Sequence, residues 1–285
     1  MKVVPFKIPK TEQEAVKVQI DNLTHFYNHL HQHPEIQLTL IKESSGTLLA
    51  GNYVGRFDQE DVLVIGSNLP HIFRNDPVYF KKKLRARSTT LFFDANVLGN
   101  QFLQISETNT LLPFLKNSIG GYRIVGNKKN RLRELILAIE NTKGFDKLIL
   151  FLEVLKLLSN KKEMLVLSTS LQQKVIGDFD GTRINKVLEH TFRESHRNIM
   201  LVEIAGVANL TVEAFCKYFK TRTGKTYVNF LNEIRIQNAC KLLLNNDQPV
   251  SLIGYETGFN NLSNFNRIFK KIIGMSPREF RKESR

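Results

Sequence analysis

Apolar stretches in the first third of the chain are short, and turn-forming residues separate them. Such stretches lie at 37–41, 47–50, 61–65 and 89–93. The segments between them are rich in serine, glycine and asparagine, which favour tight turns. Several short strands at this spacing predict a β-sandwich or barrel within residues 36–105.

Apolar positions follow a helical period further along the chain. One stripe contains Leu132, Leu135, Ile136 and Ile139, and the next contains Leu148, Phe151, Leu152, Leu155 and Leu158. Because Gly144 separates the stripes, we expect two helices, at 128–142 and 145–159. Their wide apolar faces pack either on the β-region or on the same helices of a second chain. Stripes of this size would leave a large exposed patch on a monomer, so we predict a homodimer through 128–159.

A polar segment with two glycines, at 168–182, predicts a linker between domains. Everything after Arg183 reads as helical, with breaks at Asn198, Asn209, Gly224, Gln248 with Pro249, Gly258 and Gly274. The expected fold class is therefore α+β. We divide the chain into a β-region at 1–110, a helical dimerisation region at 111–167, the linker at 168–182 and an all-α domain at 183–285.

Composition and charge narrow the class of protein. The chain has 285 residues, 42% of them hydrophobic, and a net charge of +14 at pH 7. A basic balance favours nucleic acid or an anionic surface as a partner. No apolar run approaches the roughly 18 residues of a membrane span, and the first residues lack the apolar core of a signal peptide. The cysteines, Cys216 and Cys240, have no metal-type spacing, so we expect a cytoplasmic protein without disulfides and without membrane contact.

The all-α domain contains an internal repeat. Fifty positions separate two sets of residues, Phe219, Lys220, Gly224 and Phe230 from Phe269, Lys270, Gly274 and Phe280. Upstream the offset is forty-nine, so the second copy has one additional residue between its turn and its second helix. The turn position holds Asn209 in one copy and Gly258 in the other, the residue types that most easily adopt positive φ. Each copy therefore predicts helix, tight turn and helix, an arrangement typical of DNA-binding proteins.

The second helix of each copy has an apolar face and a polar face. The residues expected to pack inward are Phe215, Tyr218 and Phe219, and Phe265, Ile268, Phe269 and Ile272. The expected N-caps of the two helices are Thr211 and Asn260. One interpretation is that the polar faces only contact solvent. Duplication within a basic domain favours the alternative, a pair of helices that meet duplex DNA.

The outward side chains suit particular parts of DNA. Arginine and lysine match guanine edges, asparagine matches adenine, and glutamate accepts from cytosine. The candidate base contacts are Glu213, Cys216, Lys217, Ser263, Asn266 and Arg267. Lysines further along each helix and the capping residues suit phosphate, which carries no base information. The candidate phosphate contacts are Thr211, Lys220, Asn260, Lys270 and Lys271.

Several segments together carry a family resemblance. They are 199–211, FKTRTG at 219–224, FLNEIRIQNACKLLL at 230–244 and VSLIGYETGFNNLSNFNRIFKKIIGMSPREFR at 250–281. Residues 183–283 thus resemble the DNA-binding domain of the AraC/XylS transcription regulators. The resemblance implies that the helix at 230–244 holds two helix-turn-helix modules at a fixed separation, so that both enter successive major-groove segments. It also implies duplex DNA, a second copy of the chain and RNA polymerase as partners, and association with the nucleoid.

Five of the seven histidines lie in the first quarter of the chain, at His25, His29, His31, His33 and His71. The segments HLHQHPEIQL at 29–38 and GSNLPHIFRND at 66–76 resemble the two motifs of a cupin barrel. That resemblance implies a cupin-like β-barrel sensor before the helical hairpin, and an unidentified small-molecule effector. The metal glutamate of such barrels is replaced here by Gln37, and a neutral amide is a poor substitute for a carboxylate.

We therefore expect no metal and no other cofactor, and we interpret four residues as hydrogen-bonding groups of an effector pocket, His31, His33, Gln37 and His71. A purely structural role for these histidines stays open. The function predicted from the sequence is a one-component, sequence-specific transcription factor and not an enzyme. Two alternatives remain: a metal-dependent cupin enzyme fused to a DNA-binding domain, and an architectural DNA-binding protein without an effector.

Overall fold

The computed structural model describes residues 14–81, 84–94, 96, 98–169 and 178–283. The chain divides into two compact units between Ile176 and Gly177. We call them the N-terminal unit and the C-terminal unit and describe each by itself. Among the described residues, no helix combines the length and the apolar character needed to cross a membrane.

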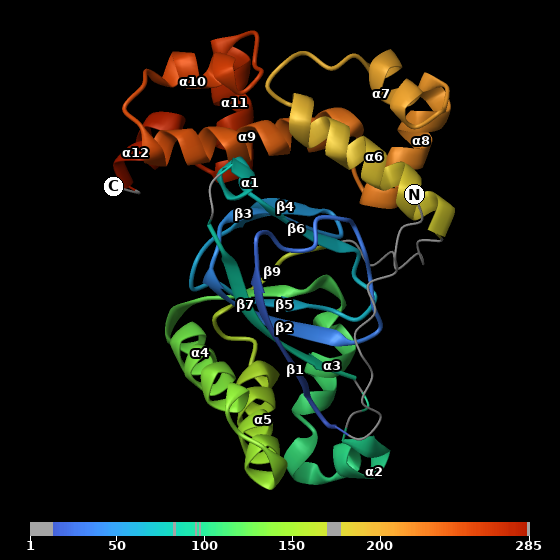
Figure 1. Cartoon of the computed structure of the whole chain (residues 1–285), viewed down its shortest axis with the longest axis vertical. Coiled ribbons are helices and arrows are strands. Elements are labelled where there is room, and N and C mark those ends of the chain that lie inside the picture. Colours follow the sequence, from blue (N-terminus) through green and yellow to red (C-terminus); the bar gives the residue numbers. More distant parts are fainter. Residues whose placement is uncertain (1–13, 82–83, 95, 97, 170–177, 284–285) are drawn as a thin grey trace. The chain divides into compact units, whose positions relative to one another are not determined.

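Two antiparallel sheets form the N-terminal unit (Figure 1). The six-stranded sheet has the order β1 (Lys17–Leu23), β7 (Ala86–Phe93), β2 (Ile36–Glu43), β5 (Val62–Ile65), β8 (Tyr122–Ile124) and β9 (Met164–Val166). The three-stranded sheet has the order β4 (Tyr53–Phe57), β3 (Gly46–Ala50) and β6 (His71–Asn75). The strands expected at 37–41, 47–50, 61–65 and 89–93 are confirmed as β2, β3, β5 and β7.

Strand β2 is buried on both faces, which explains its nearly continuous apolar character. Successive side chains of a strand point to opposite faces. Ile36, Leu38 and Leu40 belong to one apolar cluster, and Ile41 belongs to a different one. Gln37 and Thr39 alternate with the first set and line a cavity described below.

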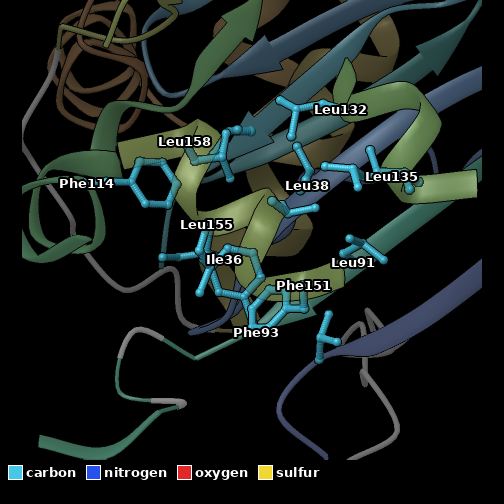
Figure 2. Packing of buried hydrophobic residues seen from close by; sticks show 14 of the residues in the cluster. Ile36, Leu38, Leu91, Phe93, Phe114, Leu132, Leu135, Phe151, Leu155 and Leu158 are labelled. Atoms are coloured by element: carbon cyan, nitrogen blue, oxygen red, sulfur yellow. The ribbon is translucent and has the colours of Figure 1, made fainter. Parts of the chain in front are cut away.

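Helices cover one face of the six-stranded sheet. The N-terminal unit contains α1 (Pro77–Lys81), α2 (Gly99–Gln104), α3 (Leu111–Asn117), α4 (Gly126–Glu140) and α5 (Gly144–Ser159), with 3₁₀ turns at Ser106–Thr108 and Ser118–Gly120. Figure 2 shows side chains of α4 and α5, among them Leu135, Phe151 and Leu155, packed against Ile36 and Leu38 of β2. The two predicted helices are confirmed, and their apolar stripes are buried within the unit.

The buried leucine stripes do not support a dimer through these side chains. Leu135 is 2% exposed and Leu155 is 0% exposed, so the stripes leave no large patch on a monomer. The large apolar side chains that α5 does expose are Phe145 and Ile149, at 75% and 44%. Any contact of α5 with a second chain must therefore use this outer face instead of the leucine stripe.

One further expectation for the N-terminal unit is wrong. The region 111–167 is not all helical, because β8 and β9 flank the helix pair and extend the six-stranded sheet beside β5. These strands have three residues each, too few for a period of two to be visible in the sequence. Strands β1, β4 and β6 were not predicted individually from the sequence, because their polar residues interrupt the alternation.

The C-terminal unit is helical throughout its described residues. Its helices are α6 (Asp178–Glu194), α7 (Leu201–Val207), α8 (Val212–Thr223), α9 (Tyr227–Asn245), α10 (Val250–Glu256), α11 (Leu262–Ile273) and α12 (Pro277–Glu283). All of the predicted breaks after Arg183 fall between helices. The predicted linker at 168–182 is wrong at its end, because α6 already includes 178–182. Residues 170–177 of that linker lie outside the described part of the chain.

The buried stripe predicts a clear difference between two positions of α5. Leu155→Ala removes a fully buried side chain and should lower the free energy of unfolding by about 2–5 kcal/mol. Ile149→Ala, at a position that is 44% exposed, is the matched control and should cost under about 1 kcal/mol. Urea denaturation of the full chain, followed by circular dichroism, measures both. Equal losses would contradict the packing of α5 on the sheet.

Candidate functional site

The first helix-turn-helix motif consists of α7 and α8. Asn209 has φ of 53° and forms the turn, as predicted for a residue type that tolerates the left-handed region. The Thr211 side chain accepts a hydrogen bond from the backbone N–H of Ala214 at 3.3 Å. Thr211 is therefore the N-cap of α8, as expected, and it satisfies one of the helix's unpaired N–H groups.

The second motif consists of α10 and α11, and its turn is at Gly258, where φ is 94°. A Cβ at this position would lie 2.4 Å from the carbonyl oxygen of Ser195, so the site accepts only glycine. The predicted cap Asn260 is wrong. Asn261 caps α11 instead, and its Oδ1 accepts from the backbone N–H of Asn264 at 3.0 Å. The additional residue of the second copy lies before its cap. Asn261 is therefore fifty positions after Thr211, the cap of the first copy.

The apolar faces of α8 and α11 hold the motifs together. Phe215, Phe219, Phe265 and Phe269 are each 0% exposed, which confirms the inward faces predicted for these residues. All of the candidate base and phosphate contacts are exposed to solvent, namely Thr211, Glu213, Cys216, Lys217, Lys220, Asn260, Ser263, Asn266, Arg267, Lys270 and Lys271. The structure therefore leaves these side chains accessible, while their roles in DNA contact stay predictions.

Two arginines beside α11, Arg278 and Arg281, were not predicted from the sequence as candidate DNA contacts. Asn266, Arg267 and Lys270 line a groove of about 860 Å³ together with Arg278 and Arg281 of α12. Arg281 Nη2 donates to the carbonyl oxygen of Gln248 at 2.7 Å, which fixes its position. The groove thus gathers four cationic side chains from two helices, a charge pattern that suits phosphate. One feature of the sequence could have indicated Arg278, because this residue follows Pro277 at the start of a helix.

Arg235 on α9 joins the two motifs. It is buried, and its guanidinium Nε donates to the carbonyl oxygen of Ser195 at 2.8 Å, while Nη2 donates to that of Arg197 at 2.7 Å. Both acceptors lie in the loop between α6 and α7. The guanidinium carbon is also 5.7 Å from the ring centroid of Phe259, which follows the turn of the second motif. One side chain therefore contacts elements that flank both motifs.

An ion-pair network supports α7 from the α6 side. Arg197 Nε donates to Glu194 at 2.8 Å, and its Nη1 donates to Glu203 of α7 at 3.0 Å. His190 Nε2 lies 2.8 Å from the same glutamate. Hydrogen bonds from Arg193 and Arg197 lower the pKa of Glu194 to about 2, and those from Arg197 and His190 lower the pKa of Glu203 to about 2. The carboxylates stay charged at neutral pH and hold the start of the first motif against α6.

A cavity of about 70 Å³ lies in the N-terminal unit. Alternate residues of three neighbouring strands give it a polar wall, formed by Gln19, Asp21, Gln37, Thr39, Ser88 and Thr90. The register places Gln37 opposite Phe92 and Thr39 opposite Thr90, and the two threonine hydroxyls are 2.9 Å apart. The rest of the wall is mainly aromatic, from Phe26, Tyr27, His31, His71, Phe73 and Phe92. A mixture of apolar surface and a few converging polar groups is typical of a small-ligand site.

Three of the four predicted effector-pocket residues line this cavity, namely His31, Gln37 and His71. His33 does not, but its Nε2 is 3.1 Å from Gln37 Oε1, so it supports the amide from behind. His31 and His71 form an isolated β-bridge with backbone hydrogen bonds of 3.1 and 2.8 Å in the two directions. This bridge brings together two histidines that lie forty residues apart in the sequence.

Burial controls the charge of these histidines. It lowers the pKa of His31 to about 4 and the pKa of His71 well below its ordinary value, because a charged imidazole loses its hydration there. Burial also lowers the pKa of His33. All three imidazoles are consequently neutral at pH 7.

Known proteins share the helix-turn-helix region. A family described as "Helix-turn-helix domain" matches residues 204–283. The MmsAB operon regulatory protein of Pseudomonas aeruginosa is 32% identical over 90 residues, which are 32% of this chain and 29% of that protein. The HTH-type transcriptional activator RhaS of Mannheimia succiniciproducens is 24% identical over 262 residues, 88% of each chain.

A solved structure, that of a probable AraC family transcriptional regulator from Rhodopseudomonas palustris, covers 36% of this chain and 98% of its own, with 23% identity and a TM-score of 0.35. The matched residues 204–283 contain both motifs, from α7 to α12, that the geometry above identifies. The chain therefore carries a helix-turn-helix domain of that description, and it is similar through this domain to known transcription regulators.

Proposed function

We propose that the chain is a one-component transcription regulator whose C-terminal unit binds duplex DNA through α8 and α11. The observation that carries the proposal is the duplicated motif, in which each second helix buries two phenylalanines and exposes its polar face. A helix presented in this way fits the major groove, and its first turns meet base edges. The proposal assigns no catalytic step to the chain.

Within each second helix, the position along the axis separates two kinds of contact. Asn266 and Arg267 lie in the first half of α11, and Lys270 and Lys271 lie in its last turn. The arginine of the first pair suits a guanine edge and the asparagine an adenine edge, whereas the lysines suit phosphate. Lys217 and Lys220 are the corresponding reader and anchor of α8.

The spacing of the two motifs is proposed to depend on Arg235. Its guanidinium bonds the loop before α7 and stacks on Phe259 beside the turn before α11. A buried cation held by carbonyl oxygens resists displacement, because any shift leaves those oxygens unsatisfied. Two recognition helices that are held in this way would engage two neighbouring segments of DNA as one unit.

The N-terminal unit is proposed to be a cupin-like sensor whose cavity accepts a small effector. The polar wall from β1, β2 and β7 and the aromatic residues opposite it support this role. At about 70 Å³ the cavity suits a compact ligand. A ligand that binds one state of the regulator more tightly than the other would shift the balance between the two states. This shift would link the cavity to transcription by RNA polymerase.

A homodimer is proposed through the outer face of α5. Phe145 and Ile149 are four residues apart on one helical face, and both are exposed. Large apolar side chains that are adjacent on a surface favour association, although single ones are common. The leucine stripe plays no part in this contact because it packs on the sheet.

Arg267→Ala should lower affinity for a selected operator far more than affinity for random DNA. Loss of one good base contact costs about 1–3 kcal/mol and relaxes preference at that base pair. Lys271→Ala is the matched control, since loss of a phosphate contact weakens binding to both DNAs about equally. Selection of sites from a random pool, followed by gel-shift titration, measures both. Identical motifs for wild type and Arg267→Ala would contradict the role given to Arg267.

Arg235→Met should weaken binding to the full selected site by about tenfold or more, since hydrogen bonds from a charged group contribute about 1.5–3 kcal/mol. Binding to a fragment with only one half of the site should change much less. Val228→Met, on the exposed face of the same helix, is the control and should bind both DNAs like wild type. A similar loss on both DNAs would mean that Arg235 supports the fold alone and does not set the spacing.

Sedimentation equilibrium of the full chain should show a dimer, and Phe145→Glu with Ile149→Glu should give a folded monomer. Two carboxylates on the contact face would have to be buried without partners, which opposes association. Asn130→Glu, on the exposed surface of α4, should stay dimeric. A double variant that remains dimeric would move the interface to another surface.

A further inference from the structure

We propose that the cavity of the N-terminal unit binds a small organic cation, with an ammonium group paired to Asp21 and a second donor group of the ligand bonded to His71 Nε2. The inference rests on the sensor role proposed above and gives the effector a chemical class. Three features of the lining support it, namely the charge of the wall, the direction of its hydrogen bonds and its aromatic rings.

The wall of the cavity is acidic although the chain is basic. The chain has a net charge of +14, yet the described residues that line the cavity include Asp21 and neither lysine nor arginine. Burial lowers the pKa of His31 and of His71, so these lining imidazoles add no positive charge at pH 7. An anionic ligand would meet a like charge here, whereas a cationic ligand meets an opposite one.

The carboxylate of Asp21 is oriented by neutral partners. Asp21 is half-buried on β1, opposite Ser88 of β7. Its Oδ1 accepts from Gln19 Nε2 at 2.9 Å, and its Oδ2 accepts from Ser88 Oγ at 3.1 Å. These bonds fix the carboxylate without neutralising its charge, and a carboxylate has about four acceptor positions in all. An ammonium group, which donates three hydrogen bonds and accepts none, is complementary to it.

His71 presents a second acceptor. It lines the cavity and is 1% exposed. Its Nδ1 lies 2.8 Å from the carbonyl oxygen of Leu69, and because a carbonyl oxygen only accepts, this nitrogen carries the proton of the neutral ring. Nε2 is therefore a lone pair, and it has no hydrogen-bond partner within the part of the chain that the structure describes. A buried acceptor in this condition costs free energy, which a donor group of the ligand would recover.

The hydroxyl groups of the wall have few protons left for a ligand. Ser88 donates its proton to Asp21. Thr39 Oγ1 accepts from Gln37 Nε2 at 2.8 Å and lies 2.9 Å from Thr90 Oγ1, so one of the two threonine protons is used between them. The wall is consequently richer in acceptors than in donors, and it selects a ligand that carries N–H and O–H groups.

Aromatic rings complete the lining and favour an organic ion over a hydrated inorganic one. They come from Phe26, Tyr27, Phe73 and Phe92. Aromatic rings attract cations and at the same time cover a short carbon skeleton. The volume of about 70 Å³ limits the ligand to a few non-hydrogen atoms. A short amino alcohol in its ammonium form has each of these properties.

Three probes of matched size test this class by isothermal titration calorimetry of the full chain at pH 7. They are 3-aminopropan-1-ol, propane-1,3-diol and 3-hydroxypropanoate, which share a three-carbon skeleton and a hydroxyl group and differ in charge. We expect the amino alcohol to bind about tenfold or more tightly than the diol, and the anion not to bind. Asp21→Asn should lower the affinity for the amino alcohol to that for the diol. Asp146→Asn, at an exposed position of α5, is the matched control and should keep the preference.

Several outcomes would overturn the inference. One is a wild-type chain that does not bind the amino alcohol, or that binds the diol or the anion as tightly. Binding of those probes instead would leave the sensor role intact with a different class of effector. An unchanged preference in Asp21→Asn would place the cation elsewhere.

A second variant decides the question if Asp21→Asn loses its circular dichroism spectrum. His71→Phe removes the Nε2 acceptor, so it should weaken binding of the amino alcohol and leave binding of propan-1-amine, which lacks the hydroxyl group, unchanged. Equal losses for both amines would contradict the contact with His71. DNA affinity of the full chain without any probe, measured by gel shift, tests the proposed regulator function separately.

Discussion

The buried guanidinium of Arg235 is the contact on which the C-terminal unit depends. Desolvation lowers the pKa of Arg235, but its ordinary value is so high that the side chain stays charged. A buried cation is stable only where acceptors surround it, and the carbonyl oxygens of Ser195 and Arg197 meet that need. Gly258 completes the arrangement, because a Cβ there would lie 2.8 Å from Arg235 Nε. The Arg235 guanidinium, the turn at Gly258 and the loop between α6 and α7 therefore determine one another's positions.

The N-terminal unit depends on a simpler constraint, the alternation of side chains along buried strands. Strand β2 gives Ile36, Leu38 and Leu40 to the core beneath α4 and α5, and Gln37 and Thr39 to the cavity. Because the period is two, a shift of register by one residue would exchange the polar and apolar sets. Such a shift would bury Gln37 and Thr39 in the core beneath α4 and α5, which costs free energy. This cost maintains the register, and with it both the fold and the polar wall of the cavity.

Local patterns account for what the sequence predicted well. The helix-turn-helix motifs follow from positive-φ residues, caps and phenylalanines within about twenty residues of one another, so they were visible without the fold. The cap Asn261 was missed by one position, since the inserted residue could be placed on either side of it. Strands β8 and β9 were missed because their partners are distant in the chain. The Arg235 contacts and the orientation of each histidine Nδ1 arise from tertiary packing, which no local pattern encodes.

The histidine cluster illustrates how burial and backbone hydrogen bonds set the charge of a group of imidazoles. Imidazoles near neutrality commonly respond to protons, because their ordinary pKa is close to 6.5. Here burial lowers the pKa of His31 to about 4, and a carbonyl oxygen already holds its Nδ1 proton. His31 is consequently neutral at physiological pH. The arrangement therefore favours neutral hydrogen-bonding groups beside the cavity over a site that responds to pH.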